Sequence, residues 1–559
     1  MDNREVASIF ENIANILEII DDNKFKTNAY HKAAQTIYHL PASIEEYWRM
    51  GTLQDIPGIG KAIQSKISEI IETGKLQYHQ ELLTKVPQGV VNMLMLPGVG
   101  PHTIRVIYQN LGIDNFDDLL KAVNDHRIRE LPGMGSKTEY NIKKGLELIK
   151  SVGESVTLGT VLPLAMDFVN FLAAGEGIEK AELIGSIRRR KPVVHDIDVL
   201  SAAADIETIK ERVRCYHLLR EITSEDAETI KGTLSLGFQF EVIMVSAEEF
   251  PLALLIGTGS KAHRARVTAM LAEKGVASGS SEEEIYRALG MDWIAPELRE
   301  DRGEIEQALK NDLPRLIERA DLKGDLHMHS EWSDGGQTLE RMVKEARDIG
   351  YEYMAITDHS KSLTISRGLN ENRLSEQREV IDKLNNKYPE IKVLAGIEVD
   401  ILKDGSLDFS DEILGQLDVV IASIHSHFNL SKEEQTHRII SAISNPHVDI
   451  IGHLTGRLLN RRLGYEVDVE AVLEAAARCN TALEINAHPD RLDISEEVAR
   501  QARAKGVKVA INSDAHGTGD LALMEYGIYN ARRGWLEPPD ILNSMNLAQL
   551  LDWLKNKPV

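Results

Sequence analysis

The sequence predicts a multidomain protein with an all-helical N-terminal region, a central mixed α/β segment and a C-terminal parallel β/α barrel. Three observations indicate this division. A Pro-Gly turn recurs three times within residues 1–150, strand-like and helical stretches mix over 151–320, and apolar strands alternate with helices over 321–559. A chain of 559 residues is long enough for about three to five domains.

The composition is that of an ordinary globular protein, with 43% hydrophobic and 27% charged residues. The sequence has no apolar run long enough for a transmembrane helix and no secretory signal at its N-terminus, so no membrane association is expected. Two cysteines, Cys215 and Cys479, exclude a disulfide scaffold and favour a cytoplasmic protein, which we expect to be a monomer. The net charge of −23 argues against nucleic acid, but the N-terminal region is close to neutral and can carry local basic faces.

The N-terminal region contains the repeat Ile-Pro-Gly-Ile-Gly (56–60), Leu-Pro-Gly-Val-Gly (96–100) and Leu-Pro-Gly-Met-Gly (131–135), and each copy opens a predicted helix, over 61–71, 102–111 and 136–149. This pattern is typical of helix-hairpin-helix motifs. Their glycines leave amides exposed, and the helix N-terminus that follows can bind a DNA phosphate without reading the bases. The predicted DNA-binding residues are Gly58, Gly60, Gly98, Gly100, Gly133 and Gly135. The alternative is a helical adaptor in which the three turns are structural.

The central segment, residues 151–320, shows strand-like stretches at 181–186, 195–202 and 236–245, separated by helical ones. The first is followed by a run of basic residues, and the second contains Asp196 and Asp198. Side chains two apart on a strand share a face, so this pair can bind metal ions together.

The C-terminal segment, residues 321–559, ends its predicted strands repeatedly in histidines and acids, where barrel enzymes place their sites. An H-x-H pair on a strand puts both rings on one face, and Asp514 with His516 repeats that spacing. Imidazole and carboxylate are ligands for zinc, manganese or iron, and clustered metals suit phosphoester hydrolysis. The predicted set can hold about three divalent metals; its members are His327, His329, Asp334, His359, Glu398, His425, His453, Asp514 and His516. Asp358 and Asn486 are expected to orient some of them.

These C-terminal motifs resemble the PHP (polymerase and histidinol phosphatase) family over roughly 235 residues. The resemblance implies a trinuclear site in a distorted barrel, loaded with Mn²⁺, Zn²⁺ or Fe²⁺ and held by the nine residues above. It also suggests that Arg457, in GHLTGRLL, faces a phosphate.

The central motifs, Gly185-Ser186 followed by Arg188-Arg189 and then Asp196-x-Asp198, resemble the nucleotidyltransferase site of family X DNA polymerases. The resemblance implies catalysis by Asp196, Asp198 and Glu241 with Mg²⁺ or Mn²⁺, and a deoxynucleoside triphosphate bound by Gly185, Ser186, Arg189, Gly259 and Ser260. With the hairpins, the whole chain resembles a bacterial family X DNA polymerase with a C-terminal PHP domain. Lys66 matches the lysine that forms a Schiff base during deoxyribose-phosphate removal, but a phosphate contact explains it equally well.

Four departures from the family pattern lie in the polymerase site. The third catalytic Asp is replaced by Glu241, the usual Gly before Asp196 is His195, the aromatic pair of the sugar pocket is Ile256-Gly257, and Arg264 stands where an Asn meets the base. None lies among the nine predicted barrel ligands. A carboxylate displaced by about 1 Å can cost on the order of a hundredfold in rate, so the polymerase is expected to be weakened.

Four functions compete at this point. The first is a repair enzyme with gap-filling polymerase and 3′→5′ exonuclease activities, acting on gapped or nicked duplexes and their 3′ ends. The second is a nuclease whose central domain only binds DNA, the third a small-molecule phosphatase, and the fourth a non-catalytic scaffold. The complete ligand set argues against the scaffold, and the hairpins argue against the phosphatase.

Overall fold

The computed structural model describes residues 3–146 and 155–556, with the exception of 39, 41, 42, 57, 97, 98, 137, 141, 144, 235 and 236. The described chain forms two compact units, one built on residues 1–153 and the other on 154–559 apart from two short loops. No helix in the described part is long and apolar enough to cross a membrane.

The first unit is all-helical, as the sequence predicts, and has a single apolar core to which α1, α2, α4 and α7 contribute. The predicted helices after the first two hairpins are confirmed as α4 and α7, whereas part of the predicted helix 136–149 lies outside the described residues. The elements are α1 (Asn3–Ile19), α2 (Lys24–Tyr38), α3 (Ile44–Arg49), η1 (Leu53–Asp55), α4 (Lys61–Thr73), α5 (Gln77–Leu83), α6 (Gln88–Asn92), η2 (Met93–Met95), α7 (Pro101–Leu111) and α8 (Phe116–Asn124).

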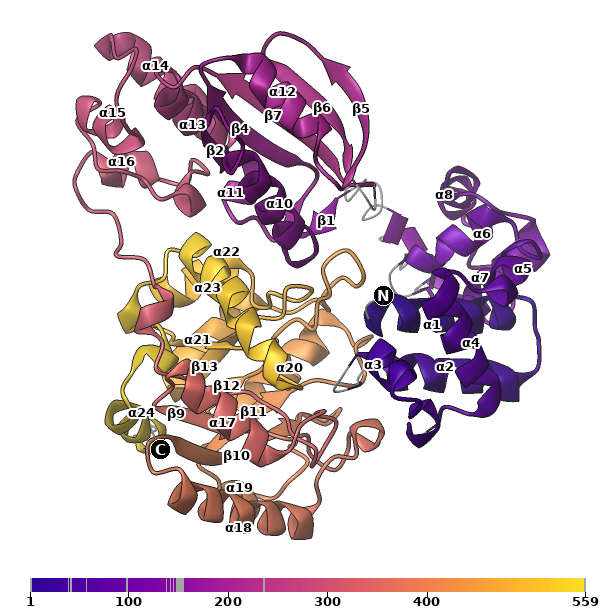
Figure 1. The fold of residues 1–559 in the computed structure, drawn as a ribbon. Helices are drawn as coiled ribbons and strands as arrows, with labels where there is room; N and C mark the ends of the chain where they lie inside the picture. The colour runs from indigo at the N-terminus through magenta and orange to yellow at the C-terminus, as the bar shows by residue number, and fades with distance from the viewer. Residues whose placement is uncertain are drawn as a thin grey trace. The chain divides into compact units, whose positions relative to one another are not determined.

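The second unit begins with a five-stranded sheet in the order β2-β4-β7-β6-β5, in which only β4 and β7 are parallel (Figure 1). Helices α10 and α12 pack on it around Phe168 and Phe240, and α13 packs through Phe250 against Leu200. The elements are β1 (Val156–Thr157), α10 (Leu158–Ala173), β2 (Ile178–Leu183), α11 (Gly185–Arg188), β3 (Val193–Val194), β4 (Ile197–Ala203), α12 (Ile206–Arg214), β5 (Leu219–Glu225), β6 (Thr229–Leu234), β7 (Gln239–Val245) and α13 (Phe250–Thr258).

Two predictions about this sheet are wrong in detail. The first predicted strand ends at Leu183, because Gly185 has a φ of +61° and starts the short helix α11. Asp196 lies in a bend before β4, which begins at Ile197, so only Asp198 of the predicted pair belongs to the strand. Strand periodicity therefore does not by itself place Asp196 beside Asp198.

A short helical segment connects the sheet to the barrel, and the ion pair between His263 and Glu304 is buried within it. Its elements are α14 (Lys261–Lys274), α15 (Glu282–Ala288), η4 (Pro296–Leu298), α16 (Glu304–Ala308) and η5 (Arg319–Asp321).

The remaining strands form the predicted parallel barrel, in the order β14-β13-β12-β11-β10-β9-β8. A bridge between Met328 and Ala515 joins the segments that follow β8 and β14, so the barrel is nearly closed. Helix α18 packs against β10 (Figure 1), and α23 packs against β14. The strands are β8 (Gly324–Asp325), β9 (Tyr353–Ile356), β10 (Lys392–Asp400), β11 (Val419–Ser423), β12 (Ile450–Ile451), β13 (Ala482–Asn486) and β14 (Val509–Asn512).

The barrel helices are α17 (Leu339–Ile349), α18 (Glu371–Lys387), α19 (Asp411–Leu414), α20 (Lys432–Ile443), α21 (Val469–Cys479), α22 (Glu496–Ala504), α23 (Met524–Arg533) and α24 (Leu547–Lys555), with short turns η6 (Thr364–Ser366), η7 (Thr518–Leu523), η8 (Pro538–Asp540) and η9 (Leu542–Ser544). The crossovers follow the strand-helix alternation that the sequence predicts.

Candidate functional site

The predicted barrel ligands gather at the C-terminal ends of the strands. Eight of the nine fall into three groups whose ligand atoms lie within 4.8 Å of one another: His329, Asp334, His359 and His516; His327, His329 and Asp514; and His359, Glu398 and His425. The ninth, His453, has its Nε2 3.0 Å from Glu398 Oε1. The first group shares His329 with the second and His359 with the third. Ligands that serve neighbouring metal ions are expected to overlap in this way.

The local backbone that presents these ligands differs from the predicted strand geometry. Strand β8 ends at Asp325, and His327 and His329 follow it in an extended segment with their ring centroids 5.2 Å apart. Asp514 has a φ of +53°, so the pair Asp514 and His516 does not repeat the strand pattern as predicted. The left-handed backbone turns the carboxylate toward His329, whose Nε2 lies 3.0 Å from Asp514 Oδ1.

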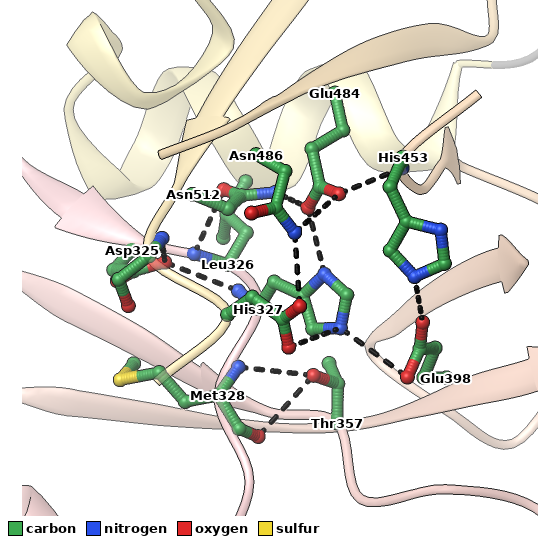
Figure 2. Close-up of polar contacts among 12 residues, drawn as sticks. Asp325, Leu326, His327, Met328, Thr357, Glu398, His453, Glu484, Asn486 and Asn512 are labelled. Carbon is green, nitrogen blue, oxygen red and sulfur yellow. Dashed lines mark hydrogen bonds and ion pairs between the residues drawn. The ribbon is translucent and has the colours of Figure 1, made fainter. Parts of the chain in front are cut away.

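The ring of His327 lies between Glu484 on one side and Glu398 on the other (Figure 2). Its Nδ1 is 2.7 Å from Glu484 Oε1, while its buried Nε2 has no hydrogen-bond partner among the described residues. That Nε2 lies 3.5 Å from Glu398 Oε2 and 3.6 Å from Asp514 Oδ1. A ring nitrogen and two carboxylate oxygens that converge beyond hydrogen-bond distance fit a divalent cation between them.

Burial and the mixture of charges shift the pKa values of this cluster strongly. Burial, together with His516 and His359, lowers the pKa of His329 to about 4, so its ring is neutral and can bind a metal. Burial alone would lower the pKa of His425, but Glu398 and Asp400 raise it to about 10. A metal at His425 must therefore displace a proton.

A second acidic site lies at the start of β4. Asp198 pairs in register with Glu241 on the neighbouring parallel strand β7. Burial, followed by the charges of Asp196 and Glu241, raises the pKa of Asp198 to about 7. Gly185 approaches so closely that a Cβ there would overlap Asp198 Oδ2. A carboxylate whose proton affinity is raised by two neighbouring carboxylates fits a divalent cation beside it.

The predicted nucleotide-binding residues have mixed surroundings. Ser260 caps α14 by accepting a hydrogen bond from the His263 amide at 3.2 Å, and Gly259 ends α13. The Arg189 side chain is 9% exposed and lies 2.9 Å from Glu300, rather than open to solvent. Ser186, in α11, is half-buried.

Four family models match segments of the chain. Residues 1–76 match the helix-hairpin-helix domain, 91–147 a SAM-like helix-hairpin-helix tandem, 270–300 the DNA polymerase beta thumb and 325–488 the PHP domain. The DNA polymerase/3′-5′ exonuclease PolX of Bacillus subtilis is 36% identical over 99% of this chain and 100% of its own length. The chain belongs to the PolX family.

Shorter proteins match a part of the chain. A protein named "Probable phosphatase" from Thermoanaerobacter is 32% identical over 42% of this chain and 94% of its own length. Another from Caldanaerobacter subterraneus is 31% identical over 36% of this chain and 80% of its own length. The Bacillus subtilis relative matches nearly the whole chain, whereas these two proteins match less than half of it.

Two further residues were suggested by the family resemblances, Arg457 by the PHP family and Lys66 by the family X DNA polymerases. Arg457 donates from Nε to the Arg491 carbonyl at 3.0 Å and from a terminal nitrogen to the Leu492 carbonyl, so these donors hold a barrel loop. The Lys66 Nζ lies 5.1 Å from the centroid of the Tyr78 ring, in a cation-π contact. The phosphate and Schiff-base roles of these two residues stay predictions.

Two of the hairpin glycines open helices, as expected. Gly60 and Gly100 are the N-cap residues of α4 and α7, and as glycines they have no side chain that could cap the helix. Gly58 and Gly133 have φ values of +86° and +74°, and Gly135 is exposed. Gly98 lies outside the described residues.

Sequence reasoning missed two buried carboxylates that orient the ligands. Glu484 contacts His327, accepts a hydrogen bond from the His453 amide at 2.8 Å and is fully buried on β13. Asp400 lies 3.1 Å from His425 Nδ1. An acid within an apolar strand was the available signal in both cases. Of the two predicted orienting residues, Asn486 donates to Asp514 at 2.9 Å, whereas Asp358 binds Ser330 and Ser333.

Proposed function

We propose that this chain is a DNA polymerase that fills gaps and a 3′→5′ exonuclease that acts on the 3′ ends of gapped or nicked DNA. The observation that carries the proposal is the convergence of nine histidines and acids at the mouth of a PHP barrel, in a chain that resembles PolX end to end. The phosphatase alternative is not favoured, because those proteins match only 42% and 36% of this chain.

For the exonuclease we propose about three divalent ions, Mn²⁺, Zn²⁺ or Fe²⁺, held by the three ligand groups. Such ions supply phosphate binding, water activation and stabilisation of the leaving oxygen. The chain's own part is to keep the ligands in place. Glu484 and Asp400 fix the ring orientations of His327 and His425 by bonding the nitrogen that faces away from Glu398.

For the polymerase we propose that Asp196, Asp198 and Glu241 hold Mg²⁺ or Mn²⁺, that Gly185, Ser186, Gly259 and Ser260 line the nucleotide site, and that Arg189 contacts the triphosphate. Gly185 is needed there because any side chain would displace the Asp198 carboxylate. The hairpin amides at Gly60 and Gly100 are the proposed phosphate contacts for duplex DNA.

The exonuclease assignment is tested by replacing both His327 and His329 with alanine in the full-length protein. We expect the variant to lose bound metal, measured after dialysis, and 3′→5′ degradation, while its affinity for gapped DNA stays near that of the wild type. His437→Ala, an exposed histidine on α20, is the matched control. Undiminished digestion by the double variant would place the nuclease site elsewhere.

A second candidate is a nuclease whose central domain only positions DNA, and a specific observation favours it. The Glu241 carboxylate is paired with Lys231, and Arg189 is buried against Glu300. Both groups already have an ion-pair partner within the protein. Incubation of one gapped duplex with and without deoxynucleoside triphosphates separates the two candidates, because only a polymerase extends the primer.

A further inference from the structure

A buried network of four charged side chains joins the nucleotidyltransferase sheet to the barrel. Arg189, which follows α11, has its Nε 2.9 Å from Glu300 Oε1. Arg533, at the end of barrel helix α23, has its Nη1 3.0 Å from the same oxygen and its Nη2 2.9 Å from Glu496 Oε1. Each of these four side chains is at most 10% exposed.

Arg533 contacts Arg189 in two ways. It donates from Nη1 to the main-chain carbonyl of Arg189 at 2.8 Å, and it shares the Glu300 carboxylate with the Arg189 side chain. Arg189 is held at a third point, because its Nη1 donates to the Thr258 carbonyl at 2.8 Å. The position of Arg189 therefore depends on a residue of the barrel domain.

The two arginines compete for one oxygen of Glu300. Burial alone would raise the pKa of Glu300, but Arg533 and then Arg189 hold it below its ordinary value, so the carboxylate stays ionised. An oxygen that accepts charge-assisted hydrogen bonds from two cations binds each of them less tightly than it would bind one. Without Arg533, the whole charge of Glu300 would act on Arg189.

We propose that Arg533 is a positioning residue of the nucleotidyltransferase site, which makes the Arg189 guanidinium available to the triphosphate of an incoming nucleotide by sharing Glu300 with it. This inference rests on the proposed function, in which Arg189 contacts the triphosphate. It also gives the barrel a role in polymerisation, since α23 follows the loop that carries Asp514 and His516.

The test uses opposite effects of two substitutions on nucleotide affinity. The dissociation constant of a deoxynucleoside triphosphate is measured on the full-length protein with a gapped duplex whose 3′ end lacks the hydroxyl and carries a phosphorothioate linkage. Arg533→Met should weaken binding about tenfold, because Glu300 then holds Arg189 alone, and Glu300→Gln should strengthen it. In the double variant the effect of Arg533→Met should disappear, and Arg533→Lys should restore part of the affinity.

Arg532→Met is the matched control, because Arg532 lies 2.7 Å from Glu297 and joins the same parts of the protein without touching Glu300 or Arg189. A merely structural role of Arg533 predicts weaker binding in every variant, Glu300→Gln included. If Arg533→Met does not fold, Glu300→Gln decides the question: stronger nucleotide binding by this variant supports the proposal, and weaker binding refutes it.

The outcomes separate this inference from the proposed function. If the wild type and all variants bind the nucleotide equally, the positioning role is refuted and the polymerase proposal stands. If only Glu300→Gln binds it, Glu300 holds Arg189 away from the nucleotide in spite of Arg533, so the positioning role of Arg533 is refuted while the proposed nucleotide site stands. If none of the proteins binds it, both are refuted.

Discussion

Lys231 on β6 lies beside Glu241 on β7, with its Nζ 2.9 Å from Glu241 Oε1. The two residues are direct neighbours in the antiparallel register of these strands. The family resemblance implies that Glu241 replaces the third catalytic aspartate. The Glu241 side chain, which is one methylene longer than that of aspartate, therefore places its carboxylate beside the Lys231 ammonium group.

From this pair we expect slow gap filling with Mg²⁺ and partial rescue by Mn²⁺. Glu241→Asp should raise the rate, because the shorter side chain withdraws the carboxylate from Lys231 and returns it toward Asp198. The measurement is single-turnover filling of a one-nucleotide gap in the His327→Ala, His329→Ala background, which prevents degradation. Glu241→Gln, which has the length but not the charge, serves as the control and should lose the remaining activity. An efficient wild-type rate that Glu241→Asp does not improve would show that the substitution is tolerated.

Removing the carboxylate charges that orient His327 and His425 should weaken metal binding without unfolding the barrel. We expect Glu484→Gln and Asp400→Asn each to lower the metal affinity about 10- to 100-fold, because carboxylates that bond the far nitrogen of a ligating histidine fix its orientation and raise its basicity. Metal titration followed by exonuclease assay gives the affinities. Asp449→Asn is the control, because this buried carboxylate binds the Val420 amide at 2.8 Å at the opposite end of the strands. Equal losses in all three variants would mean that the effect is one of stability.

Acid should destabilise the protein through Glu282, which is buried between Arg188 and Arg299 at 2.7 and 2.6 Å. Burial acts to raise the pKa of Glu282, but the two arginines lower it from 4.5 to about 2. An acid with a depressed pKa stabilises the folded state above its unfolded pKa, here by about 3 kcal/mol, and this is lost as the pH falls from 4.5 toward 2. In thermal unfolding, the advantage of the wild type over Glu282→Gln should shrink over that interval. The exposed neighbour Glu283→Gln should follow the wild type at every pH.

DNA binding should be independent of base sequence and steeply dependent on salt, because the hairpin amides contact phosphates. A Cβ at Gly60 would meet nothing within 4 Å, so substitutions there leave the fold intact. Gly60→Asp should weaken binding by placing a negative charge at the proposed phosphate contact, and Gly60→Ala should not. Affinities for two unrelated duplexes over a series of salt concentrations provide the test. A strong preference for one duplex would contradict it.

The sequence by itself predicted the helical, mixed and barrel regions and the membership of the barrel cluster. Those features depend on local periodicity and on where histidines and acids follow apolar strands, which the chain carries in its own order. His327, Glu398 and Asp514 come from strands far apart in the sequence, yet each was recognisable because parallel strands end at one face of a barrel. The helices that follow residues 56–60 and 96–100 were predicted correctly for the same local reason.

Only the tertiary structure decided which partners those side chains have. The left-handed backbone at Asp514, the bend that places Asp196 before β4, and the contacts of Glu484 with His327 all depend on segments that meet through folding. Arg189 and Arg533 are 344 positions apart, and no periodicity in either segment indicates that they share Glu300. A buried charge must find a partner wherever packing brings one within reach, and that choice is made by the fold rather than by neighbouring residues.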